Sequence, residues 1–190
     1  EQVAAALAAQ GGQARYSYCD VASEDSIKQC VQEAVAVFGP VHVAVSNAGI
    51  SETESSALEI SPAQWDRVYA INARGSFMFC RACANNMIDS QVQGSIVTIS
   101  SIMGRSAKNM TGAYASSKAA VIMFTKSLAK ALAPLGIRVN SVAPGMVSTN
   151  LYRPVETEMM MDKDSFVPWI IEQCIASGQL LIQREGTPDD

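Results

Sequence analysis

Residues 95–142 read SIVTISSIMGRSAKNMTGAYASSKAAVIMFTKSLAKALAPLGIRVNSV. A run rich in β-branched residues, Ser95–Ile99, comes first. A long segment with helical apolar periodicity follows, from about Gly112 or Ala113 to Ala133, and a second strand-like run spans Ile137–Val142. A strand, a long helix and another strand in this order indicate a right-handed crossover between two parallel strands.

The same alternation extends toward the N-terminus. Ser23 is expected to cap a helix that runs to Phe38, and Ser61 followed by Pro62 starts a helix that continues toward Ile88. Other expected elements are a helix before Gly11 and Gly12, a strand at Ala14–Val21, and a strand at Val41–Val45 that is apolar enough to be buried on both faces. The sequence therefore predicts an α/β fold, a doubly wound Rossmann-type parallel sheet with helices on both faces, in a single domain over residues 1–190.

Composition narrows the class of function. The chain has 190 residues, is 48% hydrophobic, and carries a formal net charge of −4 with its basic residues scattered. This distribution predicts no nucleic-acid partner and no membrane partner, and it favours a small-molecule substrate. No apolar run reaches the roughly 18 to 20 residues needed to span a bilayer, and the first residues lack the basic start of a signal peptide. We expect a cytoplasmic protein.

The number and spacing of the cysteines also favour a cytoplasmic location. The five cysteines are irregularly spaced in a chain of ordinary core size, which argues against a disulfide framework and for a reducing compartment. Cys80 and Cys83 form a C-x-x-C pattern, but it falls within a helical segment and has no second ligand pair. No metal site is expected.

Tyr114 and Lys118 are the most informative pair in the sequence. They stand four residues apart at the start of the long helix, so they lie on the same helical face. A cation beside a phenol favours the ionised form, which predicts a lowered pKa for Tyr114. A tyrosine of this kind suits general acid/base work on an alcohol or a carbonyl.

Unusual residues cluster where the predicted strands end. The clusters are Asn47-Ala48-Gly49, Ser100-Ser101 and Pro144-Gly145, together with Asn72-Ala73-Arg74-Gly75, which interrupts a helix. In parallel sheets ligands bind beyond the carboxyl ends of the strands. Taken with Tyr114 and Lys118, the order and spacing of these motifs resemble the short-chain dehydrogenase/reductase family over almost the whole chain.

The resemblance implies a reaction and a set of roles. Hydride would pass between a nicotinamide cofactor and a secondary alcohol or ketone, such as a polyol, a sugar or a 3-oxoacyl group, with Tyr114 as the general acid/base. By the family spacing the catalytic serine is Ser101. Lys118 would assist Tyr114 and hold the nicotinamide ribose, and Asn72 would fix a local helix distortion and a water that leads protons to the lysine.

The resemblance also implies cofactor contacts and an assembly. Besides Tyr114 and Lys118, the implied contacts are Asp20, Val21, Asn47, Ala48, Gly49, Pro144, Gly145, Val147 and Thr149. Met103, Arg105, Asn109 and Tyr152 are expected to line the substrate pocket, with Met159, Met160 and Met161 in a lid. The choice between NAD and NADP as the cofactor stays open, with a slight preference for NAD because no basic residue near Asp20 suits the 2′-phosphate of NADP. The two long helices imply a homodimer or homotetramer.

The sequence departs from the family pattern at both ends. It lacks the first strand with its glycine-rich, pyrophosphate-binding turn, and it lacks the last strand. Two alternatives therefore stay open. One is a binding or scaffold protein that keeps the fold without turnover, and the other is a cofactor-free lyase or dehalogenase, which would more naturally carry Arg at position 118.

Overall fold

A computed structural model describes residues 2–51, 58–106, 112–145, 147 and 151. Its sheet has three parallel strands in the order β1 (Val43–Ser46), β2 (Ser95–Ile99) and β3 (Arg138–Val142). Ser46 is paired with Thr98, and Thr98 with Ser141, so the three strands end level with one another. The segments that follow the strands therefore begin at one common edge of the sheet.

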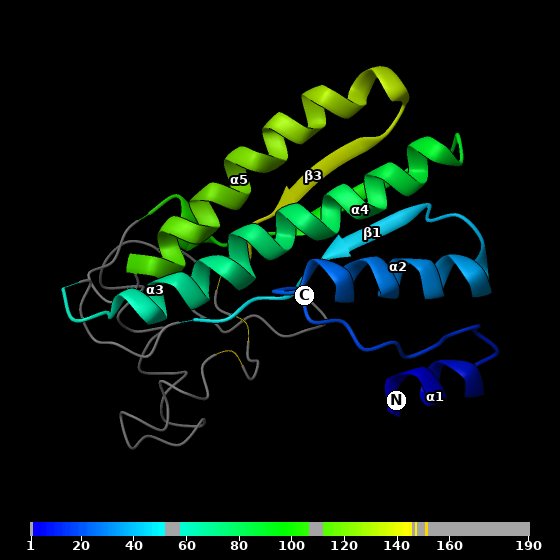
Figure 1. Ribbon diagram of the computed structural model, residues 1–190, viewed down its shortest axis with the longest axis horizontal. Coiled ribbons are helices and arrows are strands. Elements are labelled where there is room, and N and C mark those ends of the chain that lie inside the picture. The colour runs from blue at the N-terminus through cyan, green and yellow to red at the C-terminus, as the bar shows by residue number, and fades with distance from the viewer. Residues whose placement is uncertain (1, 52–57, 107–111, 146, 148–150, 152–190) are drawn as a thin grey trace.

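The helices lie along these strands (Figure 1). Helix α2 contacts α4, and α4 and α5 contact each other and the sheet. The helical elements are α1 (Gln2–Ala9), α2 (Glu24–Phe38), α3 (Pro62–Tyr69), η1 (Ala70–Gly75), α4 (Ser76–Asp89), η2 (Ile102–Gly104), α5 (Gly112–Leu132) and η3 (Ala133–Leu135). The long crossover predicted between β2 and β3 is α5. None of the helices in the described ranges is both long and apolar enough to cross a membrane.

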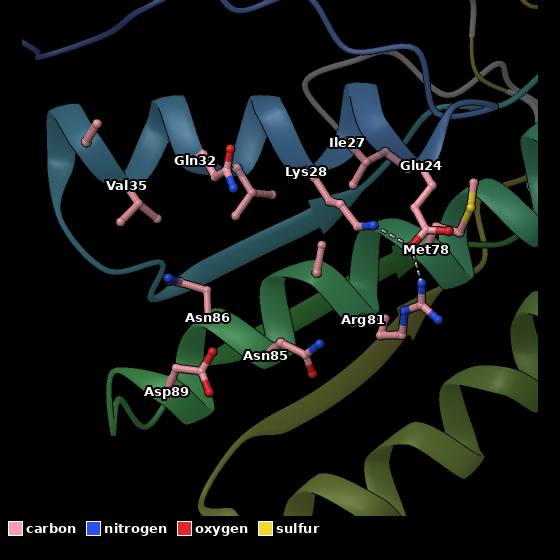
Figure 2. A pocket seen from close by; sticks show the side chains of 13 residues that line it. Glu24, Ile27, Lys28, Gln32, Val35, Met78, Arg81, Asn85, Asn86 and Asp89 are labelled. Atoms are coloured by element: carbon pink, nitrogen blue, oxygen red, sulfur yellow. Dashed lines mark hydrogen bonds and ion pairs between the residues drawn. The ribbon is translucent and has the colours of Figure 1, made fainter.

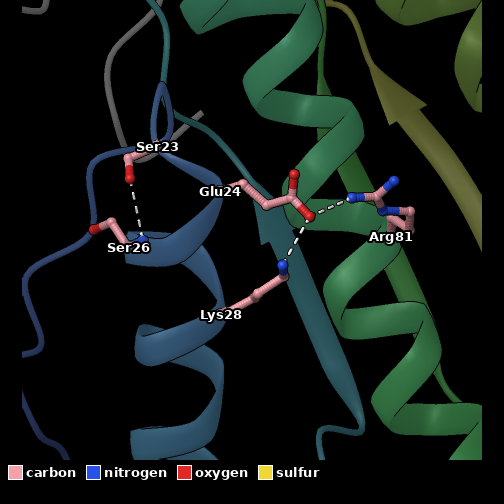
Figure 3. Close-up of polar contacts among 5 residues, drawn as sticks. All are labelled: Ser23, Glu24, Ser26, Lys28 and Arg81. Carbon is pink, nitrogen blue, oxygen red and sulfur yellow. Dashed lines mark hydrogen bonds and ion pairs between the residues drawn. The ribbon is translucent and has the colours of Figure 1, made fainter.

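The predicted start of α2 is present. The Ser23 hydroxyl accepts a hydrogen bond from the Ser26 amide at 3.3 Å, which satisfies one of the free donors of the first turn. In that turn Glu24 forms an ion pair with Lys28 at 3.0 Å and a second ion pair with Arg81 of α4 at 2.8 Å (Figure 3). The second pair links α2 to α4, although partly exposed pairs of this kind add little stability.

The helix expected from Ser61 to Ile88 is present in three parts. A capping box between Ser61 and Gln64, with Pro62 in the first turn, starts α3. The π-helical turn η1 then replaces ordinary α-helix over Ala70–Gly75, and α4 continues to Asp89. The sequence signal for this interruption is Gly75 and Asn72 in a segment that is otherwise helical.

The core lies on one face of the sheet. Ala44, Ile96 and Val139 project from the three strands into a cluster whose other buried members are Cys80, Cys83, Ala84 and Met87 of α4, Leu132 of α5, and Ile137. Helices α4 and α5 therefore cover this face. The C-x-x-C cysteines belong to the core, since Cys80 and Cys83 are only 0% and 2% exposed.

Two expectations about the strands are wrong. First, β1 is not buried on both faces, because Val43 and Val45 are 66% and 53% exposed while Ala44 and Ser46 are buried. A continuous apolar run does not reveal how much of each face the rest of the fold covers.

Second, residues 14–20 form no strand. A strand requires a neighbouring backbone, and none of the three strands pairs with this segment. Side-chain hydrogen bonds hold the segment against α2 instead: the Ser17 hydroxyl donates to Glu33 at 2.5 Å, and the Asp20 amide donates to the Ser26 hydroxyl at 2.9 Å. The alternating pattern that predicted a strand reflects the exposed Tyr16 and Tyr18.

Candidate active site

A cavity of about 310 Å³ opens at the common carboxyl edge of the three strands. Every strand contributes to its wall through the residues that end or follow it, and α5 contributes two side chains from its first turns. The lining residues are Asn47, Gly49, Ile99, Ser100, Ser101, Tyr114, Lys118, Pro144, Gly145, Val147 and Leu151. Eight of the positions proposed from the sequence as catalytic or cofactor-binding, Ser101 among them, therefore line this one cavity.

Lys118 is a buried cation at the wall of this cavity. It is 4% exposed, and its ammonium donates a hydrogen bond to the Ile99 carbonyl at 2.9 Å. Burial lowers the pKa of Lys118 below its usual value, because desolvation disfavours the charged form. One backbone carbonyl uses only one of the three N–H donors of an ammonium.

Tyr114 stands one turn before Lys118 on α5. Its ring is 9% exposed, and the Lys118 ammonium lies 5.7 Å from the ring centroid. The four-residue spacing thus places both side chains at the same cavity, as the helical repeat requires. A cation next to the ring favours a negative charge on the phenol, and the burial of both residues strengthens this effect.

The two serines after β2 have different surroundings. The Ser100 hydroxyl donates to the Val142 carbonyl at 2.9 Å, so it serves to join two strand ends. The Ser101 hydroxyl accepts from the Met103 amide at 3.1 Å and caps η2. A hydroxyl that accepts one bond still has a proton to donate. Ser101 is 6% exposed at the cavity wall.

Asn72 lies at the centre of the π-helical turn and is fully buried. Its side-chain oxygen accepts from the Ile50 amide at 2.8 Å, and its side-chain nitrogen donates to the Ile50 carbonyl at 2.8 Å. These two bonds fasten the segment after β1 to the helix. Asn72 does not itself line the cavity.

Sequence reasoning overlooked Ser117. This residue is fully buried, and its hydroxyl accepts from the Asn72 side chain at 3.0 Å while donating to the Tyr114 carbonyl at 2.7 Å. It therefore connects the π-helical turn to the turn of α5 that carries Tyr114. Its position three residues after Tyr114 on the same face was the available signal.

Gly49 illustrates why a glycine is needed at the cavity wall. A Cβ atom at this position would lie 3.2 Å from the Lys118 ammonium nitrogen and 3.4 Å from the Asn72 side-chain oxygen. The first of these contacts is tight for a charged group that must keep room for a partner. Gly49 thus lets the backbone after β1 approach two of the predicted catalytic residues.

The remaining predicted residues fall into three groups. Ala48 is exposed beside Asn47, and Met103 and Arg105 are described without lining the cavity. Thr149, Asn109, Tyr152 and the three methionines at 159–161 lie outside the described residues. Leu151 lines the cavity but was not predicted.

Asp20 and Val21 lie away from the cavity lining. The Asp20 carboxylate accepts from the Ala22 amide at 2.9 Å, a turn that leads into α2. Val21 packs against the π-helical turn, because a Cβ atom on Gly75 would lie 2.9 Å from the Val21 carbonyl oxygen. These contacts give both residues a structural role, and their contact with adenine stays a prediction.

A larger hollow of about 650 Å³ lies between α2 and α4 (Figure 2). Its wall is mainly apolar, with Val35 and Met78 on opposite helices, and charged side chains such as Glu24 and Arg81 stand at one end. It contains none of the residues that the sequence predicts to be catalytic. The larger hollow is therefore not the candidate site that the sequence indicates.

Comparison with known proteins identifies the family. The model of the short chain dehydrogenase family matches residues 1–160. Glucose 1-dehydrogenase 2 of Bacillus subtilis is 34% identical over 139 residues, which are 73% of this chain and 54% of that protein. The (3R)-3-hydroxyacyl-CoA dehydrogenase of Mus musculus is 37% identical over 150 residues, which are 78% of this chain and 58% of that protein.

A solved structure agrees with this assignment. The NAD⁺-bound xylitol dehydrogenase superposes with a TM-score of 0.85 and 28% identity, covering 98% of this chain and 72% of that one. This likeness confirms the predicted Rossmann-type α/β fold. The chain spans 54% and 58% of the length of the two curated relatives above. By its match to the family model and by this structural likeness, the chain belongs to the short-chain dehydrogenase/reductase family.

Proposed function

We propose that the protein transfers hydride between a nicotinamide cofactor and a secondary alcohol or ketone of the polyol, sugar or 3-oxoacyl type. The observation that carries this proposal is the presence of Ser101, Tyr114 and Lys118 around one cavity, with a hydroxyl, a phenol and a buried ammonium facing a common space. An acid/base group, an oxygen-binding group and a cation are what carbonyl reduction requires.

The described residues fit the nicotinamide end of the cofactor. The cavity of about 310 Å³ is of the size that holds a small ring system, and the absence of a side chain at Gly49 keeps the approach to the Lys118 ammonium open. Lys118 has N–H donors to offer ribose hydroxyls beyond its bond to Ile99. When bound, the nicotinamide supplies or accepts the hydride.

The residues have distinct tasks in this mechanism. During reduction Tyr114 gives its phenolic proton to the carbonyl oxygen of the substrate, and during oxidation it takes the proton of the alcohol. Ser101 donates a hydrogen bond to the same oxygen as negative charge develops there. Lys118 stabilises the phenolate that remains on Tyr114, and its burial strengthens that attraction.

Asn72 and Ser117 hold these groups in place. The Asn72 side chain fixes Ile50 behind Gly49, and Ser117 ties Asn72 to the Tyr114 backbone. Neither side chain needs to touch the substrate for this task. They act as positioning residues for the helix turn that presents Tyr114.

Similarity to relatives supports the type of reaction and leaves the substrate open. The two curated relatives act, by their names, on glucose and on a 3-hydroxyacyl thioester. Both substrates carry an alcohol on a secondary or hemiacetal carbon. The bound NAD⁺ of the xylitol dehydrogenase structure supports our preference for NAD over NADP.

Cofactor titration tests this proposal. We expect NADH or NADPH to bind the protein, and a Lys118→Met variant to bind it roughly 10 to 100 times more weakly, the range for hydrogen bonds from a charged donor. Lys126→Met is the matched control, because Lys126 lies on the exposed side of the same helix. Fluorescence titration gives both affinities.

Activity assays on the same samples distinguish an enzyme from a scaffold protein. Turnover of any ketone or secondary alcohol by the wild-type protein supports the oxidoreductase. Binding of the cofactor without turnover across polyols, sugars and 3-oxoacyl thioesters supports the alternative of a binding protein. Equal affinity of wild type and Lys118→Met contradicts the cavity as the cofactor site.

We also propose a homodimer or homotetramer that uses the outer surface of α3, α4 and α5. Large apolar side chains are exposed there: Trp65 at 38%, Phe77 at 39% and Met123 at 63%. Burial of these side chains against a second copy would remove their apolar area from water. Light scattering on the purified protein gives the number of copies, and a monomer contradicts this assembly.

A further inference from the structure

Two cysteines outside the cavity meet at the surface of α2. Cys19 belongs to the extended segment before α2, and Cys30 belongs to the second turn of that helix. Both side chains are partly exposed, and Cys30 is near enough to Cys19 to contribute to the raised pKa of its thiol. They are therefore close to each other and accessible from solvent.

The local structure explains why the two thiols meet. Ser26, Cys30 and Glu33 occupy positions i, i+4 and i+7 of α2, which form one helical face. The extended segment runs along this face, since the Asp20 amide is bonded to Ser26 and the Ser17 hydroxyl is bonded to Glu33. Cys19 lies between these two anchors, opposite Cys30.

We propose that Cys19 and Cys30 are a reversible redox pair that forms a disulfide in the presence of a peroxide. One thiolate attacks a peroxide oxygen, which breaks the O–O bond and gives a sulfenic acid and water. The second thiolate then attacks the sulfenic sulfur, the S–S bond forms, and hydroxide leaves and becomes water. Both sulfurs are oxidised and the peroxide is reduced, and a dithiol reductant reverses the change.

The pair differs from the other described cysteines. Cys80 and Cys83 are buried in the core, where burial raises their pKa to about 11 and about 12. Such thiols are poorly accessible to a peroxide in solvent, so they are expected to be inert, whereas Cys19, whose pKa is also raised, is partly exposed. Cys83 is near enough to interact with Cys30 and Cys19, which makes it the competing partner to exclude.

The chemistry of the pair sets the pH dependence of its oxidation. Desolvation, and next the neighbouring Cys30, raise the pKa of Cys19 to about 11. The thiolate is the reactive form, so bridge formation is slow near neutrality and accelerates as the pH rises toward that value.

Peptide mapping without reduction tests the proposal on the whole protein. After peroxide treatment and blocking of free thiols, trypsin releases each of the five cysteines on a different peptide, since Lys28 separates Cys19 from Cys30 and Arg81 separates Cys80 from Cys83. We expect the Cys19–Cys30 linkage to be the dominant one. It should disappear on treatment with dithiothreitol and form faster at pH 9 than at pH 7.

Variants make the outcome decisive. Cys30→Ser and Cys19→Ser should each abolish the linked peptide, and each provides a check if the other fails to fold. Cys174→Ser is the matched control and should leave the linkage unchanged. A dominant linkage that contains Cys83, or oxidation of the thiols without any Cys19–Cys30 peptide, overturns the proposal. Because the readout is the linkage, its failure is independent of any hydride transfer.

Discussion

Lys118 shows how burial and charge act on a single side chain. Its ammonium is nearly inaccessible to water, and among the described residues it donates a hydrogen bond to the Ile99 carbonyl and lies over the Tyr114 ring. Desolvation lowers its pKa, whereas a phenolate on Tyr114 would favour its charged form. Because these two effects on the pKa of Lys118 oppose each other, the charge of Lys118 is readily coupled to proton exchange at Tyr114. This coupling is the task that the proposed mechanism gives to Lys118.

Ser117 provides the prediction at this scale. Ser117→Ala removes the acceptor for the Asn72 side chain and the donor to the Tyr114 carbonyl. A hydrogen bond contributes about 1 kcal/mol, so we expect turnover to fall about fivefold while the KM for the cofactor is unchanged.

Ser116→Ala serves as the matched control, because the hydrogen bonds described for Ser116 run to backbone carbonyls of its own helix. A loss of thermal stability with wild-type turnover would show that Ser117 is merely structural. The conservative Ser117→Cys variant should restore part of the turnover.

Among the elements, the π-helical turn Ala70–Gly75 determines how the site is assembled. It joins α3 to α4, points Asn72 at Ile50 and Ser117, and carries Arg74, whose guanidinium donates to the Ala22 carbonyl at 3.0 Å. Segments from three parts of the chain thus meet at one turn.

Gly75→Ala tests the packing of this turn. Helix propensity alone predicts that alanine stabilises the protein by about 1 kcal/mol. The structure predicts the opposite, because the new Cβ atom would lie 2.9 Å from the Val21 carbonyl oxygen. We expect the free energy of unfolding to fall by about 1–3 kcal/mol in denaturant titrations. A stabilised variant would contradict the close approach of Val21.

The sequence predicted the elements of this fold better than their surroundings. Capping residues and apolar periodicity predicted the bounds of α2, β2 and α5 and the start of α3 nearly to the residue, since these signals are local. They failed for residues 14–20, where pairing with another strand decides the structure. They also failed for Val43 and Val45, because exposure depends on what packs against the sheet.

The residues of the candidate site were likewise predictable only where the sequence signal is local. Motif spacing predicted Tyr114, Lys118 and Ser101, and the structure brings them to one cavity. The network of Asn72, Ile50 and Ser117 was not predicted as a unit, because its bonds join residues 22 and 45 positions apart. Such long-range bonds leave no periodic signal in a single sequence.

Across the whole molecule, buried ionisable groups make stability depend on pH. The core thiols Cys80 and Cys83 have raised pKa values of about 11 and about 12 in the folded state. Above pH 9 the unfolded chain releases these protons and the folded chain retains them, so the unfolded state gains stability. Lys118 acts in the opposite sense, because its lowered pKa makes the folded chain release its proton first.

These two thiols, together with Cys19, whose pKa is also raised, outweigh the one lysine in this balance. We expect the free energy of unfolding to fall between pH 9 and pH 11 by on the order of 1 kcal/mol per pH unit. Denaturant titrations across this range measure the slope, and Cys83→Ala should make it shallower. A stability that rises over the same range would contradict the burial of these thiols.

The central claim is that Tyr114 exchanges the proton of the substrate oxygen. The most direct measurement is the rate of hydride transfer in a single turnover, with cofactor already bound, for wild type, Tyr114→Phe and the control Tyr18→Phe, whose side chain is 72% exposed. Loss of a general acid/base predicts a rate about 10² to 10⁴ times lower for Tyr114→Phe, with cofactor affinity retained and Tyr18→Phe unaffected. Hydride transfer at the wild-type rate in Tyr114→Phe would contradict the account.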